Sequence, residues 1–503
     1  MLDRGGNAAD AAVAASAVMA VVAPHMCGLG GDLFAVVAWP GQPPAALNAS
    51  GRAGSGADAD EMRGQGYRSM PFQHDVRSVT MPGCIDGLLA LHERFGSRTL
   101  SLPELLAPAR RLASDGFPVS SSLAAASARL SAQDRAAGFG TADSLVRGQR
   151  ARVAGVGRAL AAVGVSGRDG FYGFDGDTPG AELLAAGGGL FSAEDLRVPH
   201  AQWVEPLGLA AFGRTLWTVP PNSQGYLALA GAWIAEQAGM PHDPVDGAWA
   251  SVLVEAARQA AFDRPAVLHD GADGDALIAP ERLLPRVAAV RQGASGDLAD
   301  VYQAGGTTHI CVVDASRAGV SLIMSNAADF GSQLMLPRHG IFLHNRGIGF
   351  SLEPGHPAEY KPGRRPPHTL SPIAVTASSG ELDTVLGSMG GDAQPQILLQ
   401  ILARLFHAGQ EAGDAITAPR WALSREPTNG FDVWLSEAPL VVRVEGNAPA
   451  EWSQVLGDRG YQVIEEPEAD DAFGHAQVIQ AAADGMLAGA ADPRSIEGAF
   501  VGC

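Results

Sequence analysis

Two glycines followed at once by two threonines could create a chain end that does chemistry. The segment runs from Gly305 to His309 as GGTTH and leads into the β-branched stretch TTHICVVD. Glycine tolerates the distorted backbone that an intramolecular attack requires. The hydroxyl of Thr307 could attack the carbonyl carbon of Gly306 and form an ester, which water then hydrolyses. The segment therefore predicts autocleavage of the bond between Gly306 and Thr307.

The new chain start would solve a problem of reactivity. A free threonine hydroxyl is a weak nucleophile and needs a nearby base. The α-amino group of Thr307, with an ordinary pKa of about 7.7–8.0, could take the proton near neutral pH. The branched Cβ restricts χ1 and so holds the hydroxyl in place. The letters GGTT are also typical of an ordinary turn into a strand. Whether Thr307 is a nucleophile therefore has to be judged from the rest of the chain.

The surrounding pattern alternates strands and helices that could position such a nucleophile. Apolar and β-branched runs predict strands, Ala-rich and amphipathic stretches predict helices, and Gly-rich polar stretches predict loops. We expect strands at 33–39, 203–219, 307–314, 319–325, 371–377 and 383–387, helices at 7–23, 225–240, 246–263 and 395–407, a mainly helical region at 83–165, a loop at 51–73 and an exposed connection at 291–306.

Five stretches of the sequence together resemble the gamma-glutamyltranspeptidase family over nearly the whole chain. They are GGNAADAA from Gly5 with PH at Pro24 and GLGG at Gly28, MPG at Met81, TTH at Thr307, GSMGG at Gly387 and DPR at Asp492. The order and spacing of these motifs make the resemblance specific.

The resemblance implies a fold and a set of catalytic residues. It implies an α+β N-terminal nucleophile (Ntn) hydrolase, a four-layer αββα sandwich. A precursor would be cut into a large subunit of residues 1–306 and a small subunit of residues 307–503. Thr307 would be the nucleophile, and Gly390 and Gly391 would supply backbone N–H groups for the oxyanion. Ser325 falls where the family keeps a hydroxyl that steadies the nucleophile, although threonine is usual there.

The residues expected to bind the acyl group differ from those of true transpeptidases. Where the family carries its arginine, this chain has Ser50, with Arg52 two residues on. The family's ammonium-binding acid is replaced by glycine in the run Asn345-Arg346-Gly347. The family's serine pair becomes His368-Thr369. These changes, with the run GGDAQPQ, resemble the cephalosporin acylase-like and oxamate amidohydrolase-like branch.

Loss of that acid, with Arg346 beside the glycine, changes the charge that the acyl pocket is expected to bind. A guanidinium suits bidentate binding of a carboxylate. We therefore expect hydrolysis of a small-molecule amide whose acyl group bears a carboxylate but no α-amine, with Arg346 as its partner. Two alternatives stay open, namely a true gamma-glutamyltransferase or glutathione hydrolase, and an uncleaved, non-catalytic relative that acts as a binding protein.

Composition narrows the remaining classes. The formal net charge is −19, without a basic stripe, so nucleic acid is an unsuitable partner. The four cysteines have no metal-finger spacing and the thirteen histidines no paired motif, so we expect neither metal nor cofactor. Cys311 is an alternative nucleophile, but a buried strand cysteine is the preferred interpretation.

The N-terminal segment bears on localisation. The apolar run from Ala11 to Pro24 is too short to span a bilayer of about 30 Å, so we expect no membrane segment. We expect the protein in the cytoplasm. Relatives carry a strand and a helix before the GGNA motif that are missing here, so either translation begins upstream, with the periplasm as the alternative location, or the first layer is incomplete.

Overall fold

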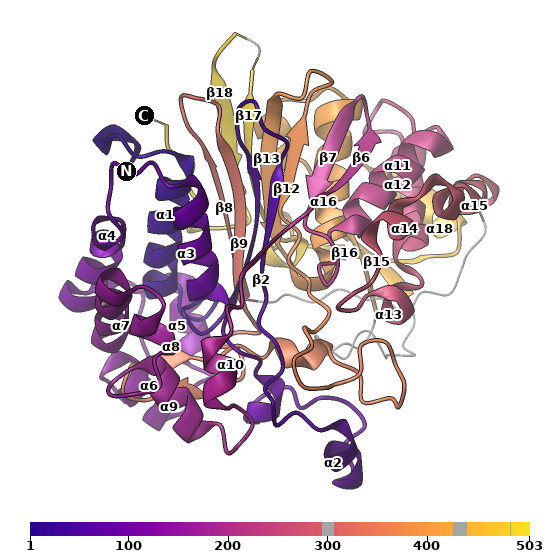
Figure 1. Cartoon of the computed structure of the whole chain (residues 1–503). Coiled ribbons are helices and arrows are strands. Elements are labelled where there is room, and N and C mark those ends of the chain that lie inside the picture. Colours follow the sequence, from indigo (N-terminus) through magenta and orange to yellow (C-terminus); the bar gives the residue numbers. More distant parts are fainter. Residues whose placement is uncertain (294–305, 426–439, 483, 503) are drawn as a thin grey trace.

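The two largest sheets lie face to face between two layers of helices (Figure 1). The computed structural model describes residues 1–293, 306–425, 440–482 and 484–502. The first sheet has the order β5 (Gln202–Val204), β2 (Ala45–Ala49), β1 (Asp32–Ala38), β9 (Gly319–Ala327) and β8 (Gly306–Val313). The second has the order β18 (Leu487–Ala491), β17 (His475–Ala481), β13 (Leu382–Met389), β12 (Ile373–Thr376), β7 (Arg214–Thr218) and β6 (Leu207–Ala211).

Each sheet carries its own layer of helices. The first is covered by α1 (Ala8–Val22) and α3 (Cys84–Phe95), with α4 (Leu102–Asp115) and α7 (Ala154–Ser166) packed outside them. The second is covered by α11 (Tyr226–Ala238) and α16 (Gln394–Leu402), with α12 (Gly247–Ala261), α15 (Pro280–Gln292) and α18 (Ala450–Asp458) packed outside them. Smaller elements are α2 (Ala59–Gly64), α5 (Ser121–Ser127), α6 (Ala132–Phe139), α8 (Asp169–Tyr172), α9 (Pro179–Ala186), α10 (Ala193–Arg197), α13 (Arg264–Val267), α14 (Gly274–Ile278), α17 (Ala412–Thr417), and a three-stranded sheet of β14 (Trp421–Arg425), β15 (Leu440–Glu445) and β16 (Gln462–Glu466).

Three apolar cores separate the four layers. One lies between the first sheet and its helices, and a second lies between the second sheet and its helices. A smaller third core joins the sheets, where Phe34 and Ile323 of the first meet Ala374 and Val385 of the second. β1 is buried along its whole length because both of its faces are covered, which explains its nearly continuous apolar sequence.

The expected elements are largely present, with two exceptions. The helix expected at 7–23 is α1, whose N-cap Asn7 and Asp10 form a capping box. The strands expected around Thr307, Gly319, Ser371 and Asp383 are β8, β9, β12 and β13. The loop expected at 51–73 was partly wrong because it contains α2, started by the side-chain cap of Asp58. Strand β2 was not expected, and residues 294–305 of the expected exposed connection lie outside the described residues.

The DPR motif at Asp492 takes part in a cluster of buried ion pairs next to β18. Asp492 pairs with Arg420 at 2.7 Å and with Arg494 at 3.0 Å, and Arg494 also pairs with Glu445. Burial acts to raise the pKa of Asp492, but Arg420 and Arg494 outweigh it and the pKa is lowered. The cluster therefore ties the segment after β18 to the β14–β16 sheet.

Replacing this acid should be costly. We expect Asp492→Asn to lower the free energy of unfolding by about 3–5 kcal/mol, because two buried arginines lose a charged partner. Because the folded pKa lies below the unfolded value of about 3.9, the stabilisation is complete above that value and is lost as pH falls through the folded pKa. Urea unfolding at pH 7 and pH 3 measures both effects. The exposed control Asp458→Asn should stay within about 0.5 kcal/mol of wild type, and an equally mild Asp492→Asn would contradict the role.

Candidate active site

Strand pairing lines up three polar side chains on one face of the first sheet. In register, Asp32 of β1 lies opposite Ser325 of β9, and Ser325 lies opposite Thr307 of β8. Directly paired residues present their side chains on the same face. Phe34, two residues after Asp32, points into the core between the sheets, so the row faces the same interior. All three residues are buried.

Ser325 contacts both groups that would react in self-cleavage. The Oγ atoms of Thr307 and Ser325 are 3.0 Å apart. Ser325 Oγ donates to the carbonyl oxygen of Gly306 at 2.7 Å and accepts from the N–H of Ala327 at 2.8 Å. Since the single proton of Ser325 goes to Gly306, the Thr307 hydroxyl must donate in its contact with Ser325. The hydroxyl and the carbonyl of one peptide bond are thus held by the same side chain.

A bulge produces this geometry at the start of β8. Gly306 pairs with Ala327 and Thr307 with Ser325, so Asn326 is an extra residue on β9. The bulge places Ala327 at φ 70°. A Cβ on Gly306 would lie 2.8 Å from the carbonyl oxygen of His25. Only glycine therefore fits before Thr307 without displacing the backbone.

The glycine pair at the end of β13 lies across from Thr307. A Cβ on Gly387 would meet His309 of β8, and Ser321 of β9 donates to the carbonyl of Leu386. His309 thus lies against Gly387. Two residues back along β8 and two residues on along β13, the same offset brings Thr307 to the end of β13. There Gly390 and Gly391 have φ values of 142° and 53°, which favour glycine. The register therefore brings the backbone of this pair near Thr307.

A buried glutamine fixes the glycine pair. Gln224 Nε2 donates to the carbonyl oxygens of Gly391 and Thr369, each at 3.1 Å. Gln224 follows β7, whereas Gly391 and Thr369 lie in separate later segments. This single amide therefore holds the turn after β13 against the segment that carries Thr369.

Asp32 is the centre of a buried charge network beside the row. Its Oδ2 lies 3.1 Å from His368 Nε2 and 3.4 Å from His344 Nδ1, and its Oδ1 accepts from the N–H of Gly51. Burial acts to raise the pKa of Asp32, but the two histidines and this backbone bond outweigh it and the pKa is lowered. Burial lowers the pKa of His368 to about 4, so its imidazole is neutral at pH 7 and donates from Nε2.

Arg346 and Thr369, two of the residues predicted to bind substrate, contact each other. Arg346 lies in a short 3-10 turn, is buried, and donates from Nη1 to Thr369 Oγ1 at 2.9 Å. Burial lowers the pKa of Arg346 to about 10, with Asp392 acting in the opposite direction. The guanidinium therefore stays charged at neutral pH inside the protein.

Three other predicted binding residues make contacts to the scaffold. Asn345 accepts from the N–H of Ala328 and donates to the carbonyl of Phe72. His368 is directed at Asp32 rather than at an open space. Arg52 is held by Asp270 at 3.3 Å and by the carbonyl of Gly363 at 2.9 Å. Each of these three side chains is therefore hydrogen-bonded or ion-paired to other residues of the protein.

The cysteine alternative finds no activating group. Cys311 lies two residues beyond His309 and its thiol donates to the carbonyl of Val385 at 3.4 Å. Burial raises the pKa of the Cys311 thiol well above its usual range, and burial lowers the pKa of His309 to about 3. A neutral thiol beside a neutral imidazole is a poor nucleophile.

Comparison with known proteins decides the family. The family model described as Gamma-glutamyltranspeptidase matches residues 1–502. The chain belongs to the gamma-glutamyltranspeptidase family.

Three individual proteins are similar over nearly their whole length. An oxamate amidohydrolase proenzyme from Klebsiella pneumoniae is 35% identical, covering 98% of this chain and 94% of the relative. A glutathione hydrolase-like proenzyme from Bacillus subtilis is 34% identical, covering 100% and 95%. The crystal structure of a cephalosporin acylase from Bacillus halodurans matches with a TM-score of 0.86 and 30% identity, covering 100% of this chain and 93% of that one.

These findings confirm the predicted fold and reaction class. The four layers are the αββα sandwich of the Ntn hydrolases, and the chain is an Ntn amidohydrolase of the gamma-glutamyltranspeptidase family. Two of these three proteins bear names of the amidohydrolase and acylase branch that the motifs indicated.

Sequence reasoning did not select four residues that the structure places at the site. Asp32 directly follows the GLGG motif but was not proposed as a site residue, and Asp392 appeared only as a letter of GGDAQPQ. Gln224 and Arg264 carry no local signal at all. Their common feature is a buried polar side chain whose partners come from distant segments, which a linear pattern does not reveal.

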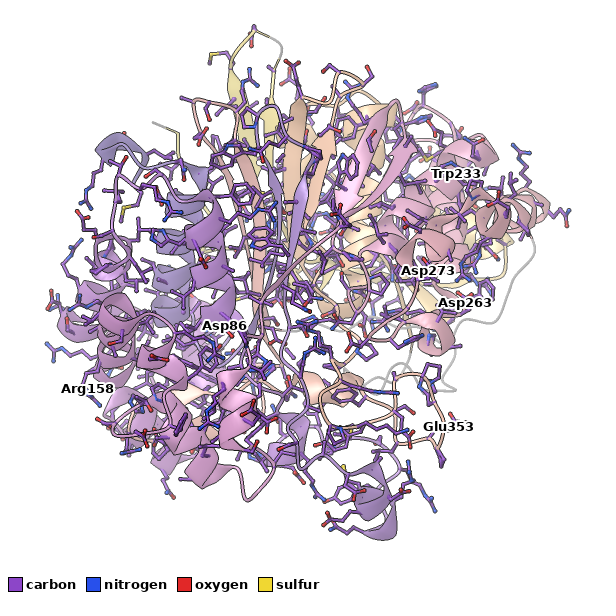
Figure 2. The ribbon with its side chains drawn as sticks, viewed as in Figure 1. Asp86, Arg158, Trp233, Asp263, Asp273 and Glu353 are labelled. Carbon is purple, nitrogen blue, oxygen red and sulfur yellow. The ribbon has the colours of Figure 1, made fainter. Side chains whose placement is uncertain are left out.

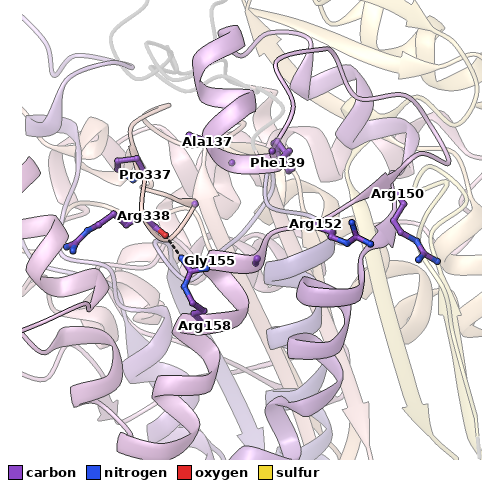
Figure 3. Close-up of a pocket in the computed structure, with 12 residues that line it drawn as sticks. Ala137, Phe139, Arg150, Arg152, Gly155, Arg158, Pro337 and Arg338 are labelled. Carbon is purple, nitrogen blue, oxygen red and sulfur yellow. Dashed lines mark hydrogen bonds between the residues drawn. The ribbon is translucent and has the colours of Figure 1, made fainter.

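A separate pocket lies in the outer helical layer (Figure 3). It has a volume of about 430 Å³ and lies between the end of α6, the start of α7 and the loop at Arg338. Arg158 donates to the carbonyl of Arg338 across it. None of the predicted site residues lines this pocket.

The described residues contain neither a cluster of metal-binding side chains nor a membrane-spanning helix. Among the residues that the structure describes, no group of three or more His, Cys, Asp or Glu side chains could hold a metal ion. Within those same residues, every helix is too short or too polar to cross a bilayer.

Proposed function

We propose that this amidohydrolase matures by cutting itself between Gly306 and Thr307 and then uses Thr307 to hydrolyse an amide with a small, carboxylate-bearing acyl group. The contact of Ser325 with both the Thr307 hydroxyl and the Gly306 carbonyl carries the proposal. A strand threonine without such a role would not need its preceding carbonyl bonded by the residue that also contacts its own hydroxyl.

Self-cleavage follows from this arrangement. Thr307 Oγ attacks the carbonyl carbon of Gly306 as its proton passes toward Ser325. The hydrogen bond from Ser325 stabilises the charge that develops on the carbonyl oxygen. The C–N bond then breaks as that proton passes on to the leaving nitrogen, which leaves an ester on Thr307 Oγ and frees the α-amino group. Water hydrolyses the ester to a Gly306 carboxylate and restores the hydroxyl.

Turnover reuses the same atoms. The freed α-amino group of Thr307 takes the proton of its own hydroxyl, and the oxygen attacks the amide carbonyl of the substrate. The backbone N–H groups of Gly390 and Gly391 bind the oxyanion, each contributing roughly 2.7–4 kcal/mol. The leaving amine takes the proton, and water then releases the acid from the acyl-enzyme.

The two products of cleavage would remain one body. Residues 1–306 would supply β1, β2, β5, β6 and β7, and residues 307–503 would supply the other strands of both main sheets. β1 hydrogen-bonds to β9 and β7 to β12, so each sheet contains strands from both sides of the cut. Large and small subunits therefore stay paired through backbone hydrogen bonds and shared cores.

Arg346 supports an anionic acyl group. Its buried guanidinium lies beside Thr369, which Gln224 links to the glycine pair. Oxamate, named for one relative, is itself the half-amide of a dicarboxylic acid without an α-amine. Small dicarboxylic half-amides are therefore the substrate class that we infer.

Two experiments test the proposal. Denaturing electrophoresis should resolve fragments of 306 and 197 residues, and the smaller should begin at Thr307 on N-terminal sequencing. A panel of oxamyl, glutaryl and γ-glutamyl amides should then favour acyl groups without the amine. A preference for γ-glutamyl amides would support a true transpeptidase, and an uncleaved chain without hydrolysis would support a binding protein.

Ser325 should control the speed of maturation. We expect Ser325→Ala to slow self-cleavage by about 10²–10³-fold, because the scissile carbonyl loses its hydrogen-bond donor. Ser325→Thr, which keeps a hydroxyl, should restore the rate to within tenfold. Disappearance of the precursor band with time measures the rate. Equal rates for wild type and Ser325→Ala would rule out the role.

A further inference from the structure

A buried carboxylate that the mechanism does not use directly follows the oxyanion glycines. Asp392 comes after Gly391 in the 3-10 turn 391–393, and its side chain is 4% exposed. Neither of its carboxylate oxygens has a hydrogen-bond partner among the described residues. Its nearest charged contact is Arg264 Nη2, at 3.6 Å. Buried carboxylates are normally hydrogen-bonded, so this one calls for an explanation.

Two arginines from distant segments act on Asp392. Arg264 begins α13, next to Asp263, which is labelled beside that helix in Figure 2. Arg346 comes from the turn that precedes the segment with Thr369. Burial raises the pKa of Asp392 to about 7, while Arg264 and then Arg346 act to lower it. Asp32 and His368 belong to the same charged surroundings, since Asp32 raises the pKa of Arg346 and Arg346 lowers that of His368.

An acyl carboxylate at Arg346 would bring a second negative charge toward Asp392. Two close carboxylates raise one another's pKa, which favours protonation of one of them near neutral pH. The substrate carboxylate would gain hydrogen bonds from Arg346, whereas Asp392 has none to lose among the residues that the structure describes. Asp392 is therefore the group that becomes protonated, and its new O–H can donate to the substrate.

We propose that Asp392 is a specificity-determining residue that takes a proton from solvent when an acyl carboxylate docks against Arg346 and then donates a hydrogen bond to that carboxylate. This inference rests on the proposed substrate class. It makes the site selective for half-amides of dicarboxylic acids. A neutral acyl group carries no negative charge that would cause Asp392 to take up a proton.

Proton uptake can be measured without turnover. Isothermal titration calorimetry of matured wild-type protein with glutarate, in buffers of different ionisation enthalpy, should show net proton uptake at pH 8. Uptake should shrink toward zero at pH 6, where Asp392 already carries its proton. By linkage, the Kd for glutarate should rise toward tenfold per pH unit above pH 7. Binding of glutarate without proton uptake at pH 8 would overturn the proposal.

Variants identify the titrating group. Asp392→Asn keeps the size and an N–H donor, so it should bind glutarate at pH 8 about as tightly as wild type does at pH 6, with no proton uptake. Asp383→Asn removes an acid of β13 that pairs with Arg214 of β7. This variant should keep the wild-type proton uptake. Uptake that persists in Asp392→Asn would assign the proton elsewhere and reject the role.

The outcomes separate this inference from the proposed function. Fragments that start at Thr307, with hydrolysis of glutaryl amides but no proton uptake, would leave the enzyme intact and remove Asp392 from recognition. Absence of glutarate binding in a protein that hydrolyses neutral amides would reject the acyl-carboxylate assignment together with this inference.

Discussion

Thr307→Ala should leave one uncut chain of 503 residues and lower amide hydrolysis by at least about 10⁴-fold. The variant keeps the backbone but removes the oxygen that attacks both Gly306 and the substrate. Electrophoresis after purification measures the cut, and hydrolysis of a chromogenic glutaryl anilide measures turnover. Thr307→Ser, which retains a hydroxyl, should still cleave, at a reduced rate.

The adjacent threonine provides a matched control. Thr308 follows Thr307 on the strand and its side chain contacts Cys27 on the opposite face. Thr308→Ala should therefore mature and hydrolyse within a few-fold of wild type. If Thr307→Ala still gives two fragments, or if an uncut chain hydrolyses as fast as a cut one, the mechanism is wrong.

Arg346→Gln should raise KM for anionic acyl amides by about 10–150-fold, with little change for neutral ones. The range corresponds to about 1.5–3 kcal/mol for hydrogen bonds to a charged group. Glutaryl and valeryl anilides have the same chain length and differ only in the terminal carboxylate, so their ratio of kcat/KM isolates the charge. The comparison uses matured protein whose small subunit begins at Thr307.

Controls distinguish recognition from general damage at this site. Arg346→Lys keeps the charge but loses the fork, so it should recover only part of the lost affinity. Arg338→Gln, at an exposed arginine of the outer pocket, should change neither substrate. An equal loss for glutaryl and valeryl anilides in Arg346→Gln would show that Arg346 supports the fold rather than the acyl carboxylate.

The proposed roles of Arg346 and Asp392 meet at one structural element. Gln224 holds the glycine pair and Thr369 together, Thr369 accepts from Arg346, and Asp392 follows the glycines. A ligand that moves Arg346 would therefore act on the segment that we propose binds the oxyanion. In this proposal, recognition of the acyl group and stabilisation of the transition state are linked through one buried amide, that of Gln224.

Local sequence predicted the nucleophile and determined the elements around it. A β-branched run after Gly305-Gly306 favours a strand because branched side chains suit a pleated surface, and β8 begins there. The Ala-rich run after Asn7 predicted a closely packed helix, and α1 is buried among the first sheet and its neighbours. β2 was missed because AALNA has no β-branched residue, and its strand conformation depends on pairing with β1 and β5.

Tertiary structure alone decided which polar groups share the site. Asp32, Ser325 and Thr307 form a row only because β1, β9 and β8 pair in one register, and a shift of one residue would turn side chains to the other face. Arg264, Arg346 and Asp392 meet from three distant segments. Periodicity reports which face of an element is apolar, whereas register and layer contacts arise from burying those faces together. The sequence therefore predicted the reactive bond, and the packing of the two sheets determined what surrounds it.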